Sequence, residues 1–178
     1  MRDRILLAKD LCGAARLTAG VTNRSAQAQE ADYDKYSFAA DPRLLGAVTW
    51  ELSTRVPVGT DVLAGLELSG IPIVTALAME TNLPAAFVRK QAETVGACKI
   101  VEGTDVSGKR AVVVVSVVTS GAQVVRRAAA LREAGAIVED VVCVIERSPE
   151  GRRALAEHGL RLHALYTMEE LLEAAASP

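Results

Sequence analysis

Four consecutive valines, Val112 to Val115, constrain the fold of this chain more than any other feature of its sequence. Residues 111–118 are apolar apart from Ser116, and the four valines make this strand apolar on both faces. Such a strand is typical of the middle of a parallel sheet that helices cover on both sides. The run stops at Thr119-Ser120-Gly121, and a helical pattern follows. We therefore expect a buried strand that ends in a small turn and leads directly into a helix.

The turn after this strand has a composition that suits a phosphate. Its residues are Thr119, Ser120, Gly121, Ala122 and Gln123. A strand-to-helix turn of this kind directs several backbone N–H groups and the positive end of the helix toward one point, where a phosphate is stabilised. The alternative is an ordinary turn, because any α/β protein has Gly and Ser between strands and helices. The composition of the turn does not distinguish a phosphate site from an ordinary turn, so the neighbouring segments have to be considered.

Composition and charge exclude several classes of function. A chain of 178 residues fits one domain that can bury a substantial core. The formal net charge of −2 argues against a nucleic-acid partner, because phosphate backbones attract basic surfaces. No apolar stretch is long enough to span a bilayer, and the N-terminal residues do not form an apolar signal segment. We expect a cytoplasmic protein that binds neither membranes nor nucleic acids.

The cysteines and histidines do not predict a metal site or a catalytic group. Cys12, Cys98 and Cys143 are an odd number without the spacing of zinc ligands, which favours buried, reduced and inert thiols. His158 and His163 have no partner at the spacing of a metal site or a catalytic triad. We expect both to be structural or surface histidines, and the sequence identifies no catalytic residue.

From Asp41 onward, apolar segments with helical and strand periods alternate, which predicts an α/β fold with a mostly parallel central sheet flanked by helices. Asp41-Pro42 is a typical helix start, and Thr167 with Glu170 resembles a capping box. Residues 91–110 predict a mobile excursion or a hairpin. The other predicted elements are helices over residues 3–17, 70–79 and 124–134, a short helix within residues 146–159, and strands over residues 33–38, 61–65, 85–90, 111–118, 136–145 and 160–166.

Several short segments follow one another in a recognisable order and spacing. They are Tyr33-Asp34-Lys35-Tyr36 with Asp41-Pro42, Gly65-Leu66-Glu67-Leu68-Ser69-Gly70-Ile71-Pro72, Phe87-Val88-Arg89-Lys90, and residues 115–123. In this arrangement they resemble the orotate phosphoribosyltransferases over most of the chain. Phe-Val-Arg-Lys after a Gly-Ile-Pro helix is the more specific signal, and the Thr-Ser-Gly turn is the less specific one. The chain is identified as a divergent member of that family.

The resemblance implies a type I phosphoribosyltransferase fold, with a small N-terminal hood over residues 1–40 and a core over residues 41–178 in one domain. It implies a homodimer and a glycosyl-transfer reaction of pyrimidine biosynthesis, in which orotate reacts with 5-phosphoribosyl 1-diphosphate (PRPP) and pyrophosphate is released with magnesium. The turn at 119–123 would then hold the 5-phosphate. Lys35, Arg89 and Lys90 would contact the donor or another anion, although Arg89 and Lys90 also fit ordinary surface charges.

The residues where the family has its donor-binding acids depart from the pattern. Val115 and Ser116 occupy the positions of an acidic pair that holds the ribose hydroxyls. The valine side chain cannot accept a hydrogen bond from a ribose hydroxyl, and Ser116 is a neutral substitute without the carboxylate charge. Within the turn, Ala122 lies where the family usually has Gly or Thr. The phosphate turn is therefore retained, whereas the charged ribose contact is not.

Two further segments depart in the same direction. Glu93 replaces a loop lysine, and Val95-Gly96 replaces a His-Gly pair, so the charge beside a pyrophosphate becomes negative. Lys99 is the alternative source of that cation. In the N-terminal segment, the family has Ser-Gly followed by a basic residue. Ser25-Ala26-Gln27 stand at those positions here, and Arg24 is the alternative basic residue.

Two classes of function remain open. The first interpretation is a protein that binds ribose 5-phosphate or a nucleotide monophosphate, with the ordinary transfer from PRPP to orotate weak or lost. The alternative is an active orotate phosphoribosyltransferase, or a relative redirected to another N-ribosidic substrate. The sequence does not identify the base, the acceptor or the physiological partner.

Overall fold

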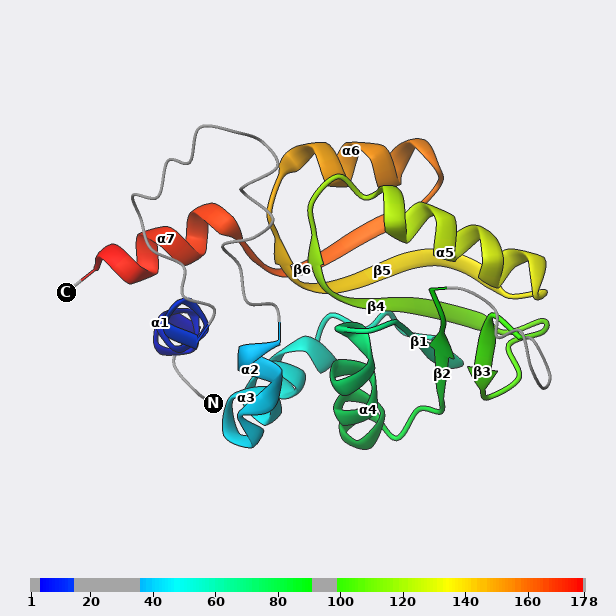
Figure 1. Cartoon of the computed structure of the whole chain (residues 1–178), viewed down its shortest axis with the longest axis horizontal. Coiled ribbons are helices and arrows are strands. Elements are labelled where there is room, and N and C mark those ends of the chain that lie inside the picture. The colour runs from blue at the N-terminus through cyan, green and yellow to red at the C-terminus, as the bar shows by residue number, and fades with distance from the viewer. Residues whose placement is uncertain (1–3, 15–35, 91–98, 178) are drawn as a thin grey trace.

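The computed structural model describes residues 4–14, 36–90 and 99–177, and a six-stranded sheet lies at its centre (Figure 1). The strands are β1 (Val62–Leu66), β2 (Ala85–Val88), β3 (Val101–Gly103), β4 (Arg110–Val118), β5 (Ile137–Glu146) and β6 (Arg161–Thr167). Their order is β3-β2-β1-β4-β5-β6, and every pair is parallel except β2 with β3. The expected mostly parallel sheet is confirmed. In the segment before the central strand, β3 pairs antiparallel with β2, and residues 91–98 lie outside the described residues.

Helices cover both faces of this sheet. They are α1 (Arg4–Ala14), α2 (Ser37–Ala40), α3 (Pro42–Ser53), α4 (Gly70–Thr81), α5 (Ala122–Glu133), α6 (Pro149–Glu157) and α7 (Met168–Ala176). Figure 1 shows α5 and α6 on one face, with α3 and α4 on the other. No helix in the described part of the chain has the length and hydrophobicity needed to cross a membrane.

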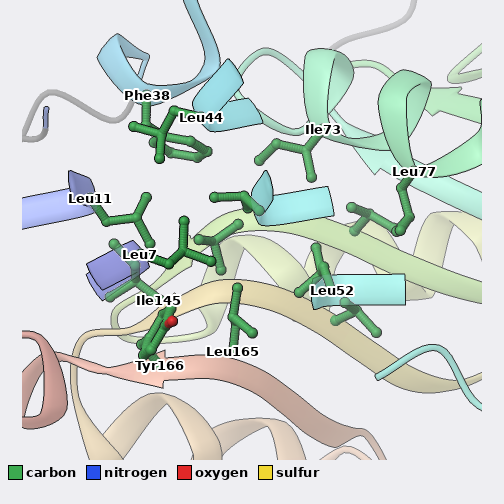
Figure 2. Close-up of a cluster of buried hydrophobic side chains, with 14 of the residues drawn as sticks. Leu7, Leu11, Phe38, Leu44, Leu52, Ile73, Leu77, Ile145, Leu165 and Tyr166 are labelled. Carbon is green, nitrogen blue, oxygen red and sulfur yellow. The ribbon is translucent and has the colours of Figure 1, made fainter. Parts of the chain in front are cut away.

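The side chains of β4 alternate between two buried cores. Val112 and Val114 belong to a core with α1, α3, α4 and α7, part of which Figure 2 shows around Leu7, Leu52 and Tyr166. Val113 and Val115 face the opposite core, beneath α5 and α6. Because successive side chains of a strand point to opposite faces, a strand between two helical layers must be apolar throughout. This position explains the run of valines from Val112 to Val115.

Two predicted helix starts are confirmed by their capping hydrogen bonds. The Asp41 carboxylate accepts from the backbone N–H of Arg43 at 2.8 Å and of Leu44 at 3.3 Å. The Thr167 hydroxyl accepts from the Glu170 N–H, and the Glu170 carboxylate accepts from the Thr167 N–H, which completes a capping box. Each cap satisfies N–H groups that have no partner inside the helix.

The strand expected over residues 33–38 is wrong for the part that the structure describes. Tyr36 lies in a turn, and Ser37–Ala40 form the short helix α2. The N–H groups of Ala39 and Ala40 both bond to the Tyr36 carbonyl, so local hydrogen bonds take the place of a strand partner. Phe38 is fully buried, and it lies on this helix. Residues 33–35 lie outside the described residues.

The first and last helices lie together at one end of the molecule. The Tyr166 hydroxyl donates to the Arg4 carbonyl at 2.8 Å, and the Arg4 guanidinium donates to the Leu165 carbonyl at 2.7 Å. Burial raises the pKa of Tyr166 to about 12. Cys12 on α1 donates to the carbonyl of Leu171 on α7. These contacts join the two ends of the described chain into one core.

Cys12 and Cys143 are both buried, as expected, and burial raises the pKa of each thiol. Cys98 lies outside the described residues.

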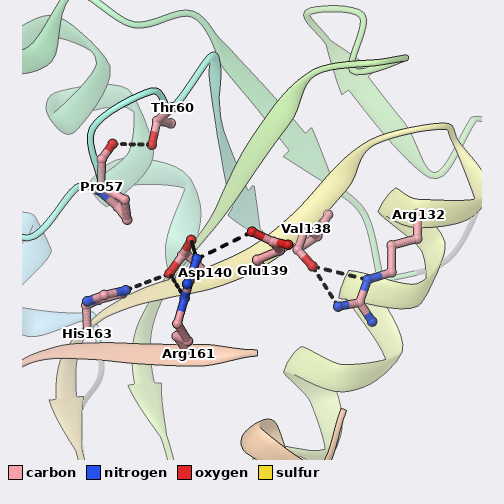
Figure 3. A network of polar contacts seen from close by, with 8 residues as sticks. All are labelled: Pro57, Thr60, Arg132, Val138, Glu139, Asp140, Arg161 and His163. Atoms are coloured by element: carbon pink, nitrogen blue, oxygen red, sulfur yellow. Dashed lines mark hydrogen bonds and ion pairs between the residues drawn. The ribbon is translucent and has the colours of Figure 1, made fainter. Parts of the chain in front are cut away.

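A polar network closes the edge of the sheet where β5 and β6 begin (Figure 3). The Asp140 carboxylate accepts from Arg161 at 2.8 and 2.9 Å, and it lies 2.7 Å from Nε2 of His163. Burial alone would raise the pKa of Asp140, but the hydrogen bonds from Arg161 and His163 outweigh it, so this pKa is lowered. His163 therefore has a structural partner, at the end of the sheet opposite to the turn at 119–123.

Candidate functional site

A cavity of about 510 Å³ opens where β1 and β4 end, beneath the starts of α4 and α5. From β1 the chain proceeds to β2 on one side, and from β4 it proceeds to β5 on the other, so the direction of the sheet order reverses between them. Ligands of open α/β sheets bind at this kind of crevice. The described lining residues are Leu66, Glu67, Ser69, Val115, Ser116, Val117, Val118, Thr119, Ser120, Gly121, Ala122, Gln123, Val124, Arg126 and Arg147.

The turn predicted to hold a phosphate forms one wall of this cavity. Gly121 has a φ of 76°, a left-handed conformation that favours glycine, and it is the N-cap residue of α5. No side chain caps α5 there, so the first N–H groups of the helix are not occupied by a capping side chain. Ala122 and Gln123, the first residues of α5, are exposed at this end. The wall is therefore a polar surface with the positive end of a helix behind it.

Helix α6 supports the turn from outside through Gly151. A Cβ atom on Gly151 would lie 2.3 Å from the Thr119 carbonyl oxygen and 2.7 Å from Cγ1 of Val118. Only a glycine lets α6 approach the turn this closely without displacing backbone. The same approach brings the Gly151 carbonyl near Gly121. The position of Thr119 therefore depends on α6 as well as on β4.

The floor of the cavity is neutral where the family resemblance implies carboxylates. Val115 and Ser116 both line it, and the Ser116 hydroxyl donates to the Ser69 hydroxyl at 2.7 Å. Ser69 precedes α4, so this bond joins the ends of β1 and β4. The side chains here do not fit a Mg²⁺ ion held by the protein, because Val115 has no side-chain oxygen and Ser116 has a neutral hydroxyl that already bonds to Ser69.

Glu67 is a carboxylate in the cavity wall that the sequence did not single out. It follows β1 directly, and its Oε2 accepts a hydrogen bond from the backbone N–H of Lys90. That contact ties the ends of β1 and β2 together and engages one carboxylate oxygen. The sequence signal that could have identified Glu67 is its position immediately after a buried parallel strand, where ligand-binding residues are common.

Two arginines in the cavity wall were also missed by the sequence analysis. Arg147 follows β5. Its backbone N–H donates to the Val118 carbonyl at 2.8 Å, which places Arg147 beside the turn. Arg126 lies on α5, four residues after Ala122. Among the described lining residues, these two guanidinium groups outnumber the single carboxylate of Glu67, so the cavity favours an anion.

The predicted basic pair lies beside the cavity instead of within its described lining. Arg89 and Lys90 follow β2, and the Lys90 carbonyl accepts from Arg127 of α5 at 2.7 Å. Lys90 is thus held between Glu67 and α5, near the rim. Their part in binding stays a prediction. Lys35, Glu93 and Val95-Gly96 lie outside the described residues.

Comparison with known proteins finds relatives that match most of this chain. No family model matches the chain. A relative from Nocardioides sp., an orotate phosphoribosyltransferase, is 46% identical over 165 residues, which cover 93% of this chain and 92% of the relative. The orotate phosphoribosyltransferase of Halobacterium salinarum is 40% identical over 79% of this chain and 80% of its own.

Solved structures show the same fold. The orotate phosphoribosyltransferase of Mycobacterium tuberculosis in complex with inorganic phosphate has a TM-score of 0.76 at 24% identity, covering 96% of this chain and 91% of its own. The same enzyme in complex with PRPP has a TM-score of 0.74 at 24% identity, covering 94% of this chain and 98% of its own. The expected type I phosphoribosyltransferase fold is confirmed. The sequence relatives settle the family: this chain belongs to the orotate phosphoribosyltransferases.

Proposed function

We propose that the protein transfers the phosphoribosyl group of PRPP to orotate, with the 5-phosphate held by the turn at 119–123. The observation that carries this proposal is 46% identity, over nearly the whole chain, to a protein named for that activity. It supports an active enzyme better than the interpretation of lost transfer. The homodimer, the cytoplasmic location and the contacts of Arg89 and Lys90 with the donor belong to the same proposal.

The residues of this chain would contribute mainly by binding and orientation. The N–H groups at the start of α5 would hold the 5-phosphate, and the guanidinium of Arg147, beside the turn, would attract an anionic substrate. Fixing both reactants in one cavity removes much of the entropic barrier to their reaction. No carboxylate at the end of β4 is available to hold the ribose, so we expect slow turnover.

A second candidate function is binding of a nucleotide monophosphate or ribose 5-phosphate without transfer. The specific observation in its favour is the neutral pair of Ser116 and Ser69 at the cavity floor, beside Val115. Such a protein would retain the phosphate turn and act as a sensor or as a subunit of another enzyme.

An orotate assay separates the two functions. We expect the wild-type protein to consume orotate, followed by its ultraviolet absorbance, only when PRPP is added. Val115→Asp with Ser116→Asp should raise the rate at least tenfold, because two carboxylates again accept hydrogen bonds from the ribose hydroxyls. Circular dichroism checks that the variant is folded. A wild-type rate equal to the blank, with nucleotide binding intact, would replace the transferase by the second candidate.

The phosphate turn has its own test, shared by both functions. Thr119→Val with Ser120→Ala removes two hydroxyls from the cavity wall, and we expect the dissociation constant of orotidine 5′-monophosphate to rise at least tenfold. Each hydrogen bond to a charged group contributes about 1.5–3 kcal/mol. Thr75→Val is the matched control, because the Thr75 hydroxyl bonds to the Ile71 carbonyl within α4. Calorimetry that found equal affinities in all three proteins would rule out this turn as the phosphate site.

A further inference from the structure

Arg126 stands out among the charged residues of the cavity because nothing in the described chain engages it. It lines the cavity from α5, yet it makes no hydrogen bond or ion pair within residues 4–14, 36–90 and 99–177. Its neighbour Arg127 differs, since Arg127 donates to the Lys90 carbonyl. An exposed guanidinium at the wall of a cavity is available for a ligand.

The geometry of α5 directs Arg126 toward the turn. Side chains of a helix tilt toward its N-terminus, and residues four apart lie on the same face. Arg126 therefore extends back over Ala122, the first residue of α5. Ala122 has only a methyl group, so it neither blocks the guanidinium nor offers a side-chain donor of its own. Gln123, the next residue, adds only a neutral amide.

We propose that Arg126 is a phosphate-binding residue, which supplies from the second turn of α5 the side-chain donor that Ala122 lacks. The ligand class is a phosphate monoester, whose dianion accepts bidentate hydrogen bonds from a guanidinium. The N–H groups at the start of α5 and the Arg126 side chain then hold the same group from two sides. This assignment rests on the proposed function, because it takes the turn at 119–123 as the phosphate site.

Isothermal titration calorimetry of the full chain with orotidine 5′-monophosphate tests the assignment. We expect Arg126→Gln to raise the dissociation constant at least tenfold. The dissociation constant of Arg126→Lys should lie between those of Arg126→Gln and wild type, because lysine keeps the charge but not the planar, forked geometry of the guanidinium. Inorganic phosphate should compete with the nucleotide for the wild-type protein, and it should no longer compete for Arg126→Gln. Arg153→Gln is the matched control, since Arg153 is an exposed arginine of α6 outside the described cavity lining.

The outcomes separate the two proposals. If wild type binds the nucleotide and Arg126→Gln binds it within twofold, the role of Arg126 is refuted and the proposed function stands. If wild type does not bind the nucleotide, the phosphate site itself is refuted, and the assignment of Arg126 with it. A loss of affinity in Arg153→Gln as large as in Arg126→Gln would show a general effect of surface charge and would also overturn the assignment.

Discussion

Gly151→Ala is expected to lower the free energy of unfolding by about 2 kcal/mol and to weaken nucleotide binding at least tenfold. The added methyl would lie 2.3 Å from the Thr119 carbonyl oxygen, which is backbone and cannot rotate away. Overpacking costs about 1–3 kcal/mol, and a contact this short belongs at the upper end. Alanine regains about 1 kcal/mol of helix propensity, so the steric effect prevails. Relief requires α6 to move away from the turn, and Thr119 then loses its support.

Urea unfolding measures the stability and calorimetry with orotidine 5′-monophosphate measures the binding. Gly46→Ala is the matched control: Gly46 lies inside α3, and a Cβ there meets no atom within 4 Å. We expect it to stabilise the protein by up to about 1 kcal/mol and to leave binding unchanged. Wild-type stability and binding in Gly151→Ala would show that α6 does not support the turn.

Arg152→Met is expected to have the largest effect on stability, a loss of about 3 kcal/mol. The Glu146 carboxylate is only 6% exposed, and it accepts hydrogen bonds from both Nε and Nη2 of Arg152. Removing one partner of a buried pair leaves an uncompensated charge and costs about 3–5 kcal/mol. The lower end applies because the Arg152 side chain is 48% exposed, so water reaches its side of the pair. Arg152 also donates to the Leu162 carbonyl, which would lose that partner.

The double variant Glu146→Gln with Arg152→Met separates the charge from the packing. Without the Glu146 carboxylate no charge is buried unpaired. We therefore expect the double variant to recover, in a urea titration, at least half of the free energy of unfolding that Arg152→Met loses. Arg153→Met serves as the control for removing an arginine from the same helix. If both variants with Met at position 152 were equally unstable, packing of the Arg152 side chain, and not the unpaired charge, would be responsible.

Sequence reasoning was successful where the determinants of structure are local. The valine run, the Asp41 cap and the capping box at Thr167 each predict their element from a few neighbouring residues, and the turn at 119–123 was located in the same way. It was wrong at Tyr36 to Phe38, because alternation of aromatic and polar residues also fits a short helix when no strand lies alongside.

The rest of the cavity wall is not local. Glu67, Arg126 and Arg147 follow or belong to three different elements, β1, α5 and β5, and they meet only because the strands are parallel and end at one edge. The order of strands in the sheet decides which of these ends are neighbours. Single-sequence periodicity predicts that strands exist, but it does not predict their order.

The hydrogen bond between Tyr166 and Arg4 joins residues 162 positions apart, and it has a consequence for synthesis in the cell. Helix α1 leaves the ribosome before β6 and α7, the elements against which its apolar side chains are buried. Until α7 has emerged, Leu7 and Leu11 have no completed surface to cover them. The nascent protein therefore exposes the apolar side chains of α1 while the whole sheet is being synthesised, and chaperones that bind exposed leucines can act during that interval.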